Sequence, residues 1–267
     1  MADEPTKQDR SLWDDLRRLS GARIGLPRAG ASLATGPLLD FKLAHARARD
    51  AVHDELDTKQ LATDLAPLGI DVITIDSAAE DRQRYLMRPD LGRKLAPDGE
   101  AKLAPRAARH DAVFVIADGL SARAVQRHAQ PVLTGTIKAL RAEGWRIGPL
   151  VIVRHGRVAV GDAIASLLGS DSVAVLIGER PGLTAPDSMG AYLTWQPHPG
   201  TTDADRNCIS NIRPDGIPYA DAEFKLAHLL RAMRARRISG VSLKDDSDQA
   251  QVQATITNKT RDAGSKP

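Results

Sequence analysis

The sequence predicts an α/β fold: a Rossmann-like, mainly parallel sheet with flanking helices, preceded by a helical N-terminal region. Two observations predict this class. Short apolar runs alternate with segments of helix length between residues 70 and 237, a pattern typical of right-handed strand–helix–strand crossovers. One run, Val173–Gly178, contains no polar residue, as expected of a strand buried on both faces of a parallel sheet.

The composition fits this class and limits the function. The 267 residues are 42% hydrophobic and only 3% aromatic, so we expect a core of Ala, Val, Leu and Ile. A net charge of +3 is weak support for a nucleic acid partner, and we expect none. No apolar run approaches the roughly 18 residues of a membrane span, and no signal-peptide pattern opens the chain. With a single cysteine, these features predict a cytoplasmic protein without membrane contact.

The N-terminal third is predicted to be helical but loosely organised. Residues 1–36 are expected to be a flexible segment with one short amphipathic helix, Ser11–Leu19, in which Ser11 is the N-cap. Its apolar stripe either docks on the protein's own body or serves as a detachable interaction or targeting helix. Residues 37–69 are expected to form a helical region in which Pro37 opens a helix to His53, followed by a second helix over Thr58–Ala66.

Residues 70–243 are expected to form the sheet domain. The predicted strands are Ile70–Ile75, Ala112–Ala117, Trp145–Val153, Val173–Gly178 and a short Tyr192–Trp195. The predicted helices are Ser121–Ala142, Ala159–Leu168 and Pro218–Arg237. Residues 77–109 are dense in Arg, Pro and Asp and are expected to be irregular, which favours contact with a partner. Residues 244–267 have almost no large apolar side chains and are expected to be a disordered tail.

Three predicted strands end in loops that contain glycine next to polar or charged residues, namely Asp118–Ser121, His155–Val158 and Glu179–Gly182. Because the carboxyl ends of parallel strands meet at one edge of the sheet, these loops predict a ligand site there. A structural salt bridge between Glu179 and Arg180 is the simpler interpretation of that pair. A polar loop over Thr201–Gly216 is expected to fold over this edge, and such a lining suits a large ligand rich in amide groups.

Several other sites are excluded by spacing. The chain has no G-x-G-x-x-G after a strand, no Walker A motif and no G-x-S-x-G, so neither a dinucleotide site nor a hydrolase elbow is expected. None of the seven histidines has zinc-binding spacing, and we expect no metal ligands. Cys208 is either a nucleophile whose pKa Arg206 lowers or a packed or ligand-contacting thiol, and we favour the second interpretation.

Four segments of the sequence, taken together, resemble the small (light) chain of ethanolamine ammonia-lyase. They read FVIADGLSARAVQRHAQPVL, RHGRVAVGDAIASLLGS, VLIGERPGLTAPDSMGAYLTW and RNCISNIRPDG. The combination of LIGERPGL with NCISNI is highly specific, and the likeness runs from about Leu38 to about Leu243. The segments before Pro37 and beyond Leu243 carry none of these motifs.

The resemblance implies a function that neither composition nor spacing shows. The family deaminates ethanolamine and related vicinal amino alcohols to an aldehyde and ammonia by a radical mechanism that uses adenosylcobalamin. It implies a hetero-oligomer with a large subunit, which holds the substrate, while cobalamin lies between the two chains. The implied cofactor contacts are Val158, Glu179 and Cys208, and no catalytic residue is expected in this chain. The ethanolamine-utilisation context also suggests that the N-terminal helix directs the chain to a bacterial microcompartment.

The expected binding mode of the cofactor is base-on. A base-off site needs the D-x-H-x-x-G signature, and no histidine in this chain has an aspartate two residues before it and a glycine three residues after it. Two alternatives to the lyase subunit remain open. One is a stand-alone corrinoid-binding carrier module. The other is an oxidoreductase on a nucleotide-binding sheet, which the missing glycine fingerprint disfavours.

Overall fold

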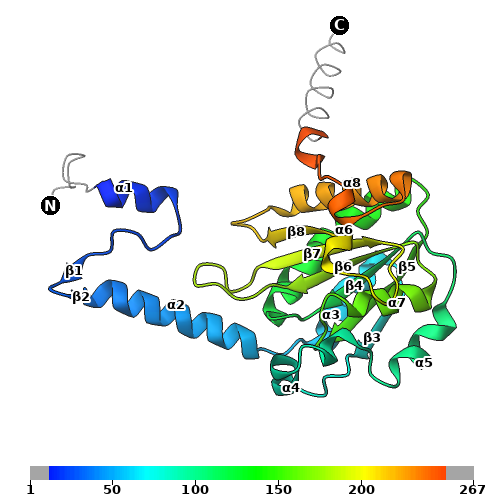
Figure 1. Cartoon of the computed structure of the whole chain (residues 1–267), viewed down its shortest axis with the longest axis horizontal. Coiled ribbons are helices and arrows are strands. Elements are labelled where there is room, and N and C mark those ends of the chain that lie inside the picture. Colours follow the sequence, from blue (N-terminus) through cyan, green and yellow to red (C-terminus); the bar gives the residue numbers. More distant parts are fainter. Residues whose placement is uncertain (1–11, 251–267) are drawn as a thin grey trace, which may run out of the picture.

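The computed structural model describes residues 12–250 as a six-stranded sheet between two layers of helices, with an N-terminal arm that projects from it (Figure 1). The strands of the sheet are β3 (Val72–Asp76), β4 (Ala112–Ala117), β5 (Ile147–Arg154), β6 (Ser172–Gly178), β7 (Met189–Trp195) and β8 (Arg206–Ile212). Its helices are α3 (Thr58–Leu65), α4 (Arg82–Met87), α5 (Gly99–Leu103), α6 (Ala122–Ala142), α7 (Val160–Leu168) and α8 (Tyr219–Arg236). The arm, residues 12–53, comprises α1 (Leu12–Leu19), the hairpin β1 (Arg28–Ala29) and β2 (Ser32–Leu33), and α2 (Thr35–His53).

The strand order is β3-β5-β4-β6-β7-β8. The first four strands run parallel, and β7 and β8 continue the sheet in antiparallel pairing. The predicted α/β class with a mainly parallel sheet and helices at the N-terminus is therefore confirmed. Since β4, β5 and β6 point the same way, the loops that follow them leave the sheet at one edge, which we call the carboxyl edge.

The core lies on both faces of the sheet. On one face, Phe114 and Ile116 of β4 pack with α3, α6 and α8. On the other face, Val113 and Val115 pack with α5 and α7. Every residue of β4 and β6 is buried, which explains their unbroken apolar runs. At about 1.5–3 kcal/mol for each large buried aliphatic or Phe side chain, these central strands form a rigid platform for the loops at the carboxyl edge.

The predicted polar loop over Thr201–Gly216 is wrong at its centre, because β8 lies there and pairs with β7. It is an edge strand with one solvent-facing side, so Cys208 and Ser210 are exposed while Ile209 and Ile212 are buried. Only two apolar residues mark it in the sequence, too few to show a strand. Similarly, β7 begins at Met189 rather than at Tyr192.

The predicted irregular segment 77–109 contains two short helices, α4 and α5, each of six residues or fewer. At the end of the described chain, residues 244–250 lie against α8, where Lys225 Nζ donates to Ser247 Oγ at 3.1 Å and His228 Nε2 lies 2.7 Å from Asp246 Oδ1. The rest of the predicted tail, 251–267, lies outside the described residues.

The arm exposes most of its apolar surface. No residue of α1 is buried, and Leu12 and Leu19 are 70% and 84% exposed. Arg17 donates to the carbonyl of Gly25 at 2.7 Å, so α1 folds back on the following segment rather than docking on the sheet. The predicted linker 22–36 holds the β1–β2 hairpin, and α2 begins two residues before Pro37. The predicted N-cap, Ser11, lies outside the described residues.

Within residues 12–250, no helix has both the length and the apolar character to cross a membrane.

Candidate functional site

Asp118 joins the loops that follow β4 and β5. Its buried carboxylate accepts the backbone N–H groups of His155 at 2.9 Å and Gly156 at 3.0 Å. Burial raises the pKa of Asp118, while these N–H donors and the Arg82 guanidinium, 3.7 Å away, oppose that rise. The two exit loops are therefore fixed to each other by a side chain at the end of β4.

Glu179 follows β6 and is oriented by the antiparallel strands. Its backbone N–H donates to Ser188 at 2.9 Å, and its carboxylate accepts the Ser188 hydroxyl. Its Oε2 also accepts the backbone N–H of Asn211 at 3.1 Å. A Cβ at Gly190 would lie 2.9 Å from Glu179 Oε1, so a larger residue there would displace the carboxylate. Since these contacts hold Glu179 and none joins it to Arg180 in the described chain, the simpler salt-bridge interpretation is not supported.

A groove lies along the carboxyl edge and consists of two adjoining cavities of about 420 Å³ and about 450 Å³. The cavities share Arg157, Val158 and Tyr192, so we treat them as one site and call it the groove. Glu179 lines the first cavity together with Val158. The structure thus brings together two of the three residues that the sequence singles out.

Cys208, the third residue, flanks the groove without lining either cavity. It lies opposite Tyr192 in the register of β7 and β8, and its exposed thiol is 3.3 Å from Ser210 Oγ. Burial, followed by the neighbouring Cys208, raises the pKa of Tyr192 well above its ordinary value. Arg206 does not activate the thiol, because both of its terminal nitrogens bind the carboxylate of buried Asp162 at 2.7 Å. This pairing gives no support to the nucleophile interpretation of Cys208, which depended on Arg206.

Two further residues of the groove, Arg157 and Tyr85, are not among the expected cofactor contacts, although Arg157 lies in the predicted site loop His155–Val158. The Arg157 guanidinium lies over the Tyr85 ring at 4.2 Å from its centroid, and Tyr85 is fully buried. Burial raises the pKa of Tyr85 to about 12. Within the described part of the chain, the Tyr85 hydroxyl and Arg157 Nε are buried without a hydrogen-bond partner. Arg157 directly precedes Val158 and was detectable from that position, whereas Tyr85 comes from an irregular segment that gives no signal.

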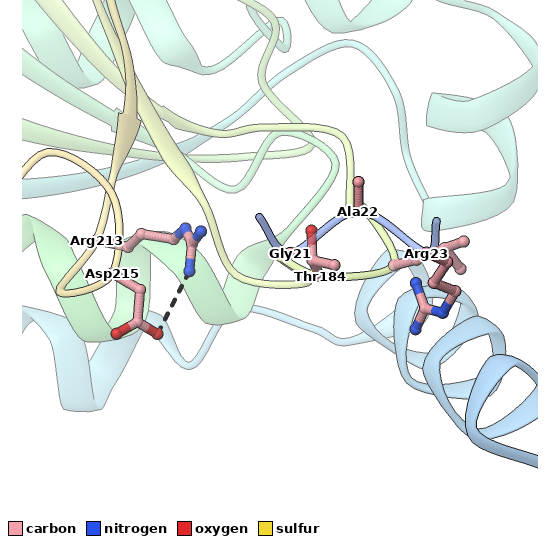
Figure 2. Close-up of a pocket in the computed structure, with 7 residues that line it drawn as sticks. Gly21, Ala22, Arg23, Thr184, Arg213 and Asp215 are labelled. Carbon is pink, nitrogen blue, oxygen red and sulfur yellow. Dashed lines mark ion pairs between the residues drawn. The ribbon is translucent and has the colours of Figure 1, made fainter. Parts of the chain in front are cut away.

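A separate cavity of about 750 Å³ lies away from the groove, between the arm and the sheet domain. Figure 2 shows Gly21 and Ala22 of the arm beside Thr184 of the β6–β7 loop, with Arg213 and Asp215 across from them. Arg213 and Asp215 face each other at 3.5 Å, and the arm residues here are exposed. This cavity holds no buried group without a partner, so we place the candidate site in the groove. Among residues 12–250, no cluster of three or more His, Cys, Asp or Glu side chains is placed to hold a metal ion.

The fold and the groove define a class of protein. A mainly parallel α/β sheet whose exit loops line a groove at the carboxyl edge is typical of a ligand-binding α/β protein. The groove offers one oriented carboxylate and several nitrogen donors, which suits a ligand with both hydrogen-bond donors and acceptors.

Comparison with known proteins assigns the family. The model of the family "Ethanolamine ammonia-lyase light chain (EutC)" matches residues 10–244. The ethanolamine ammonia-lyase small subunit of Azotobacter vinelandii is 52% identical over 244 residues, 90% of each chain. The small subunit of Ralstonia nicotianae is 48% identical over 260 residues, 96% of each chain. That of Pseudomonas fluorescens is 48% identical over 266 residues, covering 98% of this chain and 96% of its own. The chain belongs to the ethanolamine ammonia-lyase light-chain family, a lyase family.

Proposed function

We propose that this chain is the small subunit of an adenosylcobalamin-dependent ethanolamine ammonia-lyase. In this proposal it binds one side of the cobalamin, while a large subunit holds ethanolamine or a related vicinal amino alcohol and converts it to an aldehyde and ammonia. The observation that carries the proposal is the presence of Val158 and oriented Glu179 in one groove at the carboxyl edge, with Cys208 on its flank.

The chemistry of the groove fits a corrinoid. The rim of a corrin ring carries amide side chains, each of which offers N–H donors and a carbonyl acceptor. Glu179, already held by Ser188 and Asn211, accepts an amide N–H through its less occupied oxygen, Oε1. Val158 has no polar side-chain atom, so it packs on the ligand or binds it through its backbone. The unpartnered nitrogen of Arg157 supplies a donor for a ligand oxygen.

The residues of this chain orient and bury the cofactor and do not react. When bound, adenosylcobalamin supplies the radical chemistry of the reaction. The contribution of the groove to the rate is positional, because the rigid strands β4, β5 and β6 hold its loops at fixed distances. The absence of a D-x-H-x-x-G motif in the sequence supports the base-on form.

The exposed apolar side chains of the arm support a large-subunit partner. Leu39 and Leu43 of α2 are 58% and 51% exposed, which is unusual for large apolar side chains on one helix.

A second role is proposed for the α1 stripe, namely targeting to a bacterial microcompartment. Deleting residues 1–20 should abolish the localisation of a fluorescent fusion to the compartment; retained localisation would remove the targeting role.

The decisive experiment is an assay of ammonia release from ethanolamine. The chain is mixed with a candidate large subunit and adenosylcobalamin, and each component is omitted in turn. We expect release only when all three are present. A chain that purifies alone with tightly bound cobalamin and gives no activity with any large subunit would instead indicate a stand-alone corrinoid carrier. Nicotinamide binding in place of cobalamin binding would indicate an oxidoreductase.

A further inference from the structure

In the part of the chain that the structure describes, three arginines around the groove have no acidic partner. Arg157 lines both cavities, Arg93 lines one and Arg180 lines the other. Within residues 12–250, none of the three has a carboxylate oxygen within 4.0 Å. Paired arginines lie close by, such as Arg82 with Asp118 and Arg206 with Asp162. The groove therefore contains positive charge that the described chain does not neutralise.

The two carboxylates that line the groove, Asp203 and Glu179, offset part of this charge and leave about one of the three positive charges uncompensated. Asp203 lines one cavity and lies 3.7 Å from Nε of Arg206, whose charge is already paired with Asp162. Glu179 lines the other cavity, and its carboxylate is bound by Ser188 and Asn211. The remaining positive potential favours a ligand that carries a negative charge.

Of the three arginines, Arg157 has the fixed geometry that a specific contact with a ligand requires. It is half-buried, its guanidinium stacks on Tyr85, and one terminal nitrogen donates to the Tyr85 carbonyl at 3.2 Å. Its orientation is therefore fixed before any ligand binds. Its Nε is nevertheless buried without a partner, a state that a ligand oxygen would relieve. By contrast, Arg93 and Arg180 are exposed and act through their charge.

Base-on cobalamin carries one anionic group, the phosphodiester of its nucleotide loop, whereas the side chains of its corrin ring are neutral amides. We propose that Arg157 binds this phosphodiester, with Arg93 and Arg180 strengthening the local positive potential. A planar guanidinium is well matched to phosphate oxygens. The assignment rests on the proposed function and adds a second contact type to it, since Glu179 meets amide N–H groups while Arg157 meets the anion.

The test compares two corrinoids, one of which lacks the anion. Cyanocobalamin contains the nucleotide loop, and dicyanocobinamide lacks the loop together with its phosphodiester. Each is titrated into the assembled complex with the large subunit, and the dissociation constant is measured by absorbance or calorimetry. Arg157→Gln should weaken cyanocobalamin binding by about 10- to 100-fold, as for a lost hydrogen bond to a charged group, and change cobinamide binding by less than about threefold.

Control variants separate this contact from general effects of charge and folding. Lys138→Gln removes one positive charge from an exposed site near the C-terminal end of α6, at the opposite edge of the sheet, and should leave both affinities unchanged. Arg157→Lys should restore part of the cyanocobalamin affinity. If Arg157→Gln fails to assemble, exposed Arg180→Gln replaces it, and a loss of about two- to fivefold for cyanocobalamin alone is expected from its charge.

Two results overturn this assignment while the proposed function stands. One is an equal loss for both corrinoids, which would place Arg157 against the ring amides. The other is unchanged binding of cyanocobalamin to the variants. A wild-type complex that binds neither corrinoid overturns the proposed function and this assignment with it.

Discussion

The pentapeptide FKLAH occurs once in the arm, at Phe41–His45 of α2, and once in the sheet domain, at Phe224–His228 of α8. In both helices the aromatic ring and the histidine ring lie about one turn apart, with centroids 6.2 Å and 6.0 Å from each other. Their surroundings differ. Leu226 of α8 is fully buried, whereas the matching Leu43 of α2 is 51% exposed.

The charged residues of the two copies differ in the same way. In α8, Lys225 binds Asp248 and His228 binds Asp246, both from the segment after α8. In the described chain, Lys42 and His45 of α2 have no such acidic partner, although they line a small surface cavity. Identical local sequence thus gives one packed and one open surface, because tertiary contacts decide burial. The side chains of the α8 copy find their partners within the same chain, whereas those of the α2 copy stay exposed and could be covered by another chain.

The largest expected difference between the two regions concerns buried charge. Arg206→Ala in the sheet domain leaves Asp162 buried without its cation and should lower the free energy of unfolding by about 3–5 kcal/mol. Arg17→Ala in the arm removes a partly exposed pair with Asp14 and should cost less than about 1 kcal/mol. Urea denaturation of both variants checks this. Equal losses would mean that the arm is as tightly integrated as the sheet.

The matched leucines of the two pentapeptides give the next largest effect. Leu226→Ala creates a cavity in the core and should lower the free energy of unfolding by about 2–5 kcal/mol. Leu43→Ala should change it by no more than about 0.5 kcal/mol in the free chain, because half of that side chain already contacts water. In the complex with a large subunit, Leu43→Ala should weaken assembly. A large loss of stability for Leu43→Ala in the isolated chain would contradict the comparison.

Alkaline pH gives a smaller effect that reports on the sheet domain alone, because the arm contains no tyrosine. Burial raises the pKa of Tyr85 to about 12, while an unfolded tyrosine titrates near 10. Between these values the unfolded chain releases the proton first, so the contribution of Tyr85 to stability is intact below about pH 10 and falls by about 2–3 kcal/mol as pH rises toward 12. Tyr85→Phe should show a shallower fall in denaturation measured from pH 9 to 11.5. Parallel curves for the two proteins would indicate that Tyr85 titrates normally.

The sequence predicted the parts of the fold that depend on local pattern. The central strands were found because burial on both faces requires unbroken apolar runs, and β4 was placed at its observed bounds, Ala112–Ala117. The edge strand β8 was missed, since solvent on one side permits polar residues such as Cys208 and Ser210. The start of β7 was missed because Met189–Ala191 follow a loop without a clear boundary signal.

The site could be predicted only in part. Exit loops after parallel strands identify the edge on which Glu179 and Val158 lie together, whereas the resemblance to the light-chain family singled out these two residues. Tyr85 could not be found, because its position beneath Arg157 depends on how residues 77–109 fold across the sheet. The orientation of Glu179 by Ser188 and Asn211 likewise depends on the pairing of β7 and β8, which the sequence did not reveal.

The most direct test of the account is the cobalamin affinity of Glu179→Gln in the assembled complex. The amide oxygen of Gln can still accept from Ser188 and Asn211, so the loop should hold while the less occupied oxygen, Oε1, is replaced by a donor NH₂ group. Glu143→Gln, at the C-terminal end of α6, is the matched control away from the groove. We expect a dissociation constant about 10- to 100-fold higher for Glu179→Gln, with normal assembly, and no change for the control. An unchanged affinity for Glu179→Gln would mean that cobalamin does not bind at this edge of the sheet.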